Sequence, residues 1–93
     1  MINIDQITKE GYERWPQLSV ALDPEPAMEF LEGWCSANEP SVDGAKRMKE
    51  ALREYLMERF KEVCVSELID ALAENVSCIM LEEFIKQIKK EKL

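Results

Sequence analysis

Apolar residues recur at spacings of three and four along nearly the whole chain, and this period limits the folds open to it. The clearest run lies between residues 42 and 63 and comprises Ala45, Met48, Leu52, Tyr55, Leu56, Phe60 and Val63. A helix turns about 100° per residue, so these side chains share one face. The pattern predicts an amphipathic helix over 42–63 that packs against other helices.

Capping signals divide the rest of the chain into further helices, which we expect over 5–14, 24–37, 66–74 and 78–91. Asp23 suits a helix N-cap, and Pro24 suits the first helical position. Asn75 is interpreted as a left-handed stop and Ser77 as a new cap, so they separate the last two helices. Residues 17–22 alternate like a strand, but no second strand candidate exists, and we expect a short helix or a loop there.

The predicted elements and the composition together indicate the fold class. The chain has 93 residues, of which 46% are hydrophobic, enough for one core. Helices with short connections pack as antiparallel neighbours. We therefore expect an all-α fold, a compact bundle of four to five short helices in a single domain spanning 1–93.

Several classes of site have no basis in the sequence. The chain has no histidine, which is the commonest general base and metal ligand, and its three glycines are isolated rather than gathered in a phosphate-binding loop. Glu50, Glu54, Glu58 and Glu62 recur at helical spacing, but on the face opposite the apolar residues. We expect a protein that is not an enzyme, with no catalytic residues, cofactor or metal.

The cysteines and the hydropathy bear on the expected location. No stretch approaches the roughly 20 apolar residues that span a bilayer, and no basic start precedes an apolar run. Cys35, Cys64 and Cys78 are odd in number and form no CxxC pair, so a disulfide framework is not expected. We interpret all three as small hydrophobic residues of a cytoplasmic protein without membrane contact.

Negative charge is concentrated in the first half of the chain. Residues 1–45 hold nine acids and two bases and so carry the whole net charge of −7, whereas residues 46–93 hold ten of each. A nucleic-acid binder needs clustered Lys and Arg, so this distribution argues against direct nucleic-acid binding. It is compatible with a protein partner that has a basic surface.

One acidic row is the best candidate for a partner-binding surface. Glu25, Glu29 and Glu32 share the helix face opposite Phe30, Leu31 and Trp34. The surface is predicted to include Glu10 and Glu13, with Trp15 as an aromatic anchor beside a helix break. The row is equally what the solvent-exposed side of any amphipathic helix presents.

The first functional hypothesis is a non-catalytic protein-binding protein. Its acidic face would occupy a basic surface of a nucleic-acid-handling machine, as small acidic inhibitors of the phage or mobile-element anti-defence type do. This analogy rests on size and charge alone.

Two alternatives stay open. One is a self-associating structural or adaptor module, a homodimer whose contact uses Met57 and Cys64. The other is a transcriptional regulator, because residues 67–90 loosely resemble a helix-turn-helix unit. That unit would present Ser77, Ile79 and Glu82 to DNA, without any Arg, Asn or Gln to contact base edges.

Overall fold

The computed structural model describes residues 3–38, 41–61 and 66–91, and all regular structure within these ranges is helical. The helices are α1 (Ile4–Arg14), α2 (Pro16–Ala21), α3 (Pro24–Ala37), α4 (Val42–Arg59) and α5 (Ser66–Glu91). The predicted all-α class and single bundle are confirmed.

Local capping sets where three of the helices begin. Asn3 Oδ1 accepts a hydrogen bond of 3.0 Å from the Gln6 amide at the start of α1. Asp23 Oδ1 accepts one of 3.0 Å from the Glu25 amide, and Pro24 occupies the first turn of α3. Ser41 Oγ accepts one of 2.8 Å from the Gly44 amide at the start of α4. These bonds satisfy amides that have no partner within the helix, and α3 has the bounds that the sequence predicts.

A proline creates the junction between α1 and α2. Pro16 starts α2, and Trp15 caps the end of α1, where its amide donates to the Tyr12 carbonyl at 3.1 Å. Leu18 and Leu22 are buried, whereas Val20 is 90% exposed. The helical interpretation of residues 17–22 is therefore confirmed, because the buried residues follow a helical spacing of four.

Helix α4 is shorter than predicted. It ends at Arg59, with Phe60 and Lys61 in a turn, and positions 62–65 lie outside the described residues. The predicted inward residues Ala45, Met48, Leu52 and Leu56 are all buried. Tyr55 stacks on Phe30 of α3, with ring centroids 4.8 Å apart, so α3 and α4 share an aromatic contact.

The predicted break between residues 74 and 78 is wrong, because α5 is one continuous helix of 26 residues. Asn75 does not adopt a left-handed conformation. Its Nδ2 donates to the Ala71 carbonyl at 2.8 Å, and its Oδ1 accepts from Arg14 on α1 at 3.0 Å. Ser77 does not cap a new helix, because its hydroxyl donates to the Glu74 carbonyl at 2.9 Å. Side-chain bonds that remain compatible with helical backbone thus replace the predicted caps.

The helix-turn-helix interpretation loses its structural basis with that break. No turn separates residues 67–90, and the residues that would face DNA do not form one open face. Ser77 and Ile79 are buried in the bundle, while Glu82 is exposed.

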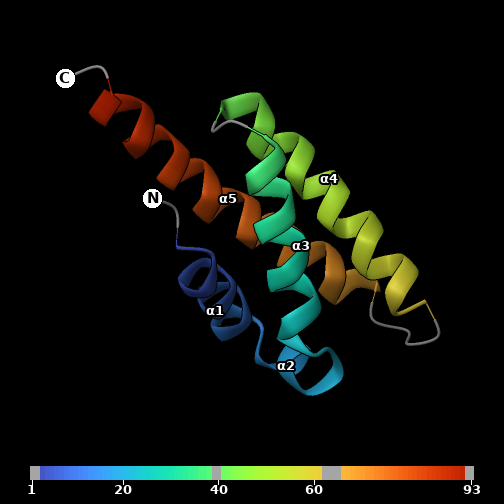
Figure 1. Cartoon of the computed structure of the whole chain (residues 1–93). Helices are drawn as coiled ribbons and strands as arrows, with labels where there is room; N and C mark the ends of the chain where they lie inside the picture. Colours follow the sequence, from blue (N-terminus) through green and yellow to red (C-terminus); the bar gives the residue numbers. More distant parts are fainter. Residues whose placement is uncertain (1–2, 39–40, 62–65, 92–93) are drawn as a thin grey trace.

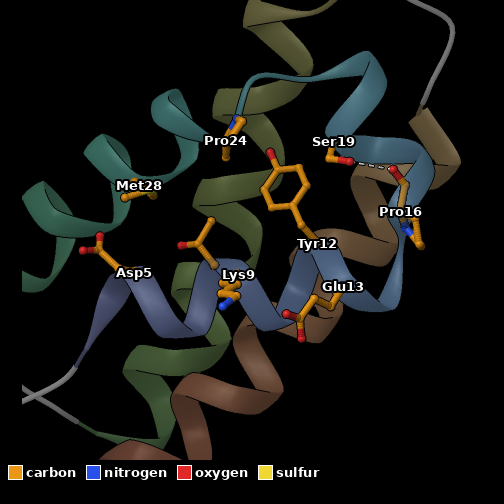
Figure 2. Close-up of a pocket in the computed structure, with 9 residues that line it drawn as sticks. Asp5, Lys9, Tyr12, Glu13, Pro16, Ser19, Pro24 and Met28 are labelled. Carbon is orange, nitrogen blue, oxygen red and sulfur yellow. Dashed lines mark hydrogen bonds between the residues drawn. The ribbon is translucent and has the colours of Figure 1, made fainter.

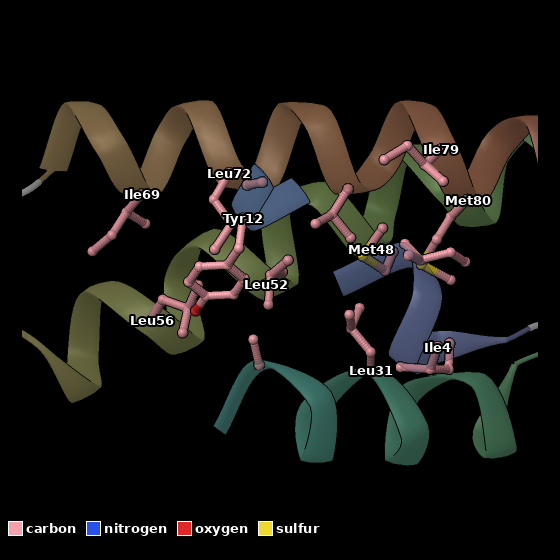
Figure 3. Packing of buried hydrophobic residues seen from close by; sticks show 14 of the residues in the cluster. Ile4, Tyr12, Leu31, Met48, Leu52, Leu56, Ile69, Leu72, Ile79 and Met80 are labelled. Carbon is pink, nitrogen blue, oxygen red and sulfur yellow. The ribbon is translucent and has the colours of Figure 1, made fainter. Parts of the chain in front are cut away.

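Helix α5 is the element around which the others are arranged. It runs the length of the molecule in Figure 1, with α4 along one side and α1 and α2 also packed against it. Figure 3 shows the core between α5 and α3, where Leu72, Leu52 and Leu31 project toward one another. Met80 and Phe84 extend the core along α5, whereas Ile85, predicted to face inward, is 37% exposed. Each of α1, α3 and α4 thus has one buried face and one face exposed to solvent.

Candidate partner-binding surface

The acidic row on α3 is exposed. Glu25, Glu29 and Glu32 all face solvent, while Ala27 and Leu31 on the opposite face are buried. Phe30 and Trp34 are partly buried and pack against the core. The prediction that the apolar side chains of this helix face the core and its glutamates face solvent is therefore confirmed. Contact between the row and a partner requires this exposure.

The ion pairs between described residues all lie in the second half of the chain. Lys49 pairs with Glu74 and Arg53 with Asp70, which ties α4 to α5. The other two pairs are local and join Lys61 to Glu58 and Lys86 to Glu83, each at 3.3 Å. By contrast, none of the three glutamates of the α3 row pairs with a cation that the structure describes. Their charge is thus not neutralised by described neighbours.

The remaining predicted surface residues occupy three different settings. Glu13 is exposed on α1 and lines a groove that α1 shares with α3. Glu10 is partly buried and accepts a hydrogen bond of 3.0 Å from Gln6. Trp15 is partly buried and packs against the core at the α1–α2 junction. The structure therefore places Glu13 in the lining of the same groove as Pro24 and Met28 of α3, while Trp15 packs within the bundle.

The groove next to the acidic row has a volume of about 580 Å³ and a mostly apolar lining. Its walls come from three helices, as Figure 2 shows: Asp5, Thr8, Lys9, Tyr12 and Glu13 of α1, Pro16 and Ser19 of α2, and Pro24 and Met28 of α3. Clefts of this size and lining commonly hold ligands or partner side chains. The sequence analysis missed this groove, because it forms only where three helices meet.

Tyr12 is the unusual residue of this groove. It is 7% exposed, and its hydroxyl is the only buried side-chain oxygen or nitrogen among the described residues that has no hydrogen-bond partner. Burial and, to a smaller extent, the nearby Asp23 carboxylate together raise the pKa of Tyr12 to about 12. The phenol therefore stays neutral and keeps its proton near neutral pH, so it can both donate and accept.

A second, smaller hollow lies between α4 and α5. It measures about 410 Å³ and is lined in part by Lys49, Glu74 and Cys78. Cys78 is exposed, with its Sγ 3.9 Å from a carboxylate oxygen of Glu74. Cys78, interpreted from the sequence as a small hydrophobic residue, therefore lies at the surface beside this hollow and not in the core. Cys35 is half-buried against the core, in keeping with its interpretation, and Cys64 lies outside the described residues.

The structure also bears on the other candidate sites. Met57, proposed as part of a self-association contact, is partly buried and packs against the core. Within 3–38, 41–61 and 66–91, no three Cys, Asp or Glu side chains converge as a metal would need. Over the same residues, no helix combines the length and the apolar content needed to cross a bilayer.

Comparison with protein-family models, with curated proteins and with solved structures found no match to this chain.

Proposed function

We propose that this protein acts by binding another protein, with the acidic face of α3 placed against a basic surface of that partner. The observation that carries the proposal is the exposed row Glu25, Glu29 and Glu32, which has no ion pair with any described cation. A partner with clustered Lys and Arg would supply the missing opposite charge. Complementary charge of this kind speeds encounter and selects partners.

The partner class follows from the chemistry of the row. Nucleic-acid-handling proteins carry basic channels that bind phosphates. Along α3, Glu25 and Glu29 are four residues apart, or about 6 Å along the axis, so the row presents regularly spaced negative charges, as a phosphate backbone does. The proposed role is an inhibitor that occupies such a channel, of the kind phages and mobile elements direct against host defences.

The test is affinity purification of the tagged protein from its native cell, with co-purifying proteins identified by mass spectrometry. Wild type is compared with an α3 triple variant (Glu25→Lys, Glu29→Lys, Glu32→Lys). An α4 triple variant (Glu50→Lys, Glu54→Lys, Glu58→Lys) undergoes the same change in net charge on another exposed row, so it is the matched control.

We expect a basic nucleic-acid-binding protein to co-purify with wild type and with the α4 triple variant, and to be lost from the α3 triple variant. We also expect raised salt to release it, because screening weakens contacts between exposed charges. Retention of the same protein by the α3 triple variant would show that the acidic face is not the binding surface.

A further inference from the structure

The proposed charge contact lies beside the groove between α1, α2 and α3, and the groove has features of its own that point to an occupant. Its lining is mostly apolar, and Figure 2 shows Pro16, Pro24 and Met28 spaced around it. The ring of Tyr12 crosses the groove, with its hydroxyl directed toward the space between Pro24 and Ser19. A buried hydroxyl without a partner is costly, so it marks a place where a polar atom is missing.

The margin of the groove adds a charge requirement. Asp5 and Glu13 are exposed on the α1 wall, with Lys9 between them, and none of the three forms an ion pair with a described residue. Asp23 lies near the Tyr12 hydroxyl, and the α3 glutamates continue the negative surface. The lone Lys9 is outnumbered by these carboxylates, so a cationic occupant is favoured.

We infer that the groove holds a short segment of the protein partner in which an apolar side chain is flanked by Lys or Arg. This inference rests on the proposed function and names the part of the partner that is recognised. The apolar side chain lies on Pro24 and Met28, and the flanking cations face Asp5, Glu13 and the α3 row. A backbone amide or carbonyl of the segment reaches the Tyr12 hydroxyl.

A peptide segment fits these requirements better than a small amine does. It supplies an apolar side chain, a cation and a backbone hydrogen-bonding group together, which is how grooves recognise helical or extended peptides. The Tyr12 oxygen is covered in the free protein. Binding therefore includes a small outward shift of the side of the groove formed by Pro24 and Ser19.

The test uses three six-residue peptides and nuclear magnetic resonance of the ¹⁵N-labelled protein. The first peptide has a central Phe-Leu pair flanked by Lys-Arg pairs. The second replaces Phe-Leu with Ser-Ser, and the third replaces every base with Glu. We expect the first peptide to shift amides of groove residues saturably. The second should bind at least about tenfold more weakly, because it buries no apolar side chain. The third should not bind.

Two tryptophan variants locate the binding site. Ser19→Trp fills the groove from its edge and is expected to weaken the first peptide about tenfold or more. Val20→Trp places the same side chain at the next position of α2, which is 90% exposed and does not line the groove, so it should bind as wild type does. Tyr12→Phe is expected to weaken binding several-fold.

The inference is overturned if the first peptide shows no saturable binding up to about 1 mM, the weak limit of useful affinity. It is also overturned if Ser19→Trp and Val20→Trp bind that peptide equally well. Neither result tests the proposed function. That proposal is supported if the partner from native cells co-purifies with wild type but not with the α3 triple variant. Loss of the groove site and loss of the acidic contact are thus separate outcomes.

Discussion

Gly11 on α1 lies against Val76 on α5, so that a Cβ atom at Gly11 would stand 3.0 Å from Cγ2 of Val76. The same atom would stand 3.1 Å from Cδ1 of Leu72. The missing side chain at Gly11 is what allows the two helices to approach this closely. One turn further along α1, Arg14 donates to Asn75 at 3.0 Å and extends the same contact.

Replacing Gly11 and Gly33 with alanine should have opposite effects on stability. Gly33 on α3 has no neighbour within 4 Å of its Cβ position, so Gly33→Ala should raise the free energy of unfolding by about 1 kcal/mol through helix propensity. At Gly11 the same gain meets an overpacking cost of about 1–3 kcal/mol, because Val76 is a stiff β-branched residue. Gly11→Ala should therefore lower stability by about 1 kcal/mol. Urea unfolding of both variants measures the contrast, and equal stabilisation by both would contradict the close packing.

Tyr12→Phe should stabilise the free protein. It removes the buried hydroxyl that has no hydrogen-bond partner, whose desolvation costs about 1–3 kcal/mol. We expect a higher midpoint in urea than for wild type. Tyr55→Phe is the control, because Tyr55 is partly exposed and its hydroxyl is not among the buried groups lacking a partner. A lower midpoint for Tyr12→Phe would mean that the hydroxyl has a bonding partner in solution.

The pH dependence of stability above pH 10 should also come in part from Tyr12. An unfolded tyrosine loses its proton near pH 10, whereas the folded protein holds the Tyr12 proton until about pH 12. Between these values the unfolded state binds fewer protons, so the free energy of unfolding falls as pH rises, by at most about 1.4 kcal/mol per pH unit. The stabilisation that comes from this difference in the pKa of Tyr12 is fully present below pH 10. Urea unfolding from pH 9 upward should show a steeper loss for wild type than for Tyr12→Phe, and equal slopes would argue against it.

A proline at Cys78 should distinguish one continuous helix from two. If residues 66–74 and 78–91 were separate helices, position 78 would be a first-turn site where proline is tolerated. Within the continuous α5, Cys78→Pro removes a helical hydrogen bond and should cost about 3 kcal/mol or more. Cys78→Ala is the control and should change stability little. Similar urea midpoints for the two variants would favour the broken helix.

The two described cysteines should react with iodoacetamide at different rates. Cys78 is exposed, whereas Cys35 is half-buried and burial raises the pKa of its thiol. Less thiolate and less access both slow alkylation, so Cys35 should be modified several-fold more slowly in the folded protein. Mass spectrometry of the cysteine-containing peptides resolves the sites, and the difference should disappear in urea. Comparable rates without urea would contradict the burial of Cys35.

Features that depend on nearby residues could be predicted from the sequence. The Asp23 cap, the first-turn Pro24 and the α1 end before Pro16 follow from backbone chemistry within a few residues, and all three are confirmed. The continuity of α5 through Asn75 and Ser77 could not be predicted from nearby residues. Both residues favour helix ends in isolation, but in the fold Asn75 bonds to Arg14, which is 61 residues away in the chain. Packing of Val76 and Ile79 then holds α5 helical through this region.

The candidate site also has features that could be predicted from nearby residues and features that depend on tertiary packing. Exposure of Glu25, Glu29 and Glu32 followed from the helical period of α3 alone. The groove and the unpaired Tyr12 hydroxyl could not be anticipated, because Pro16, Ser19, Pro24 and Met28 meet Tyr12 only after three helices have packed. Tyr12 itself fitted the apolar face of α1, a pattern that carries no information about the partner of its oxygen.

Because α5 contacts α1, α2 and α4, these earlier helices leave the ribosome before the helix that they need as their packing partner. During synthesis, the apolar side chains that α5 helps to bury, such as Leu18, Leu52 and Leu56, stay exposed until residues 66–91 emerge. Chaperone demand should therefore peak late in translation, and a ribosome stalled before α5 would hold a nascent chain prone to aggregation.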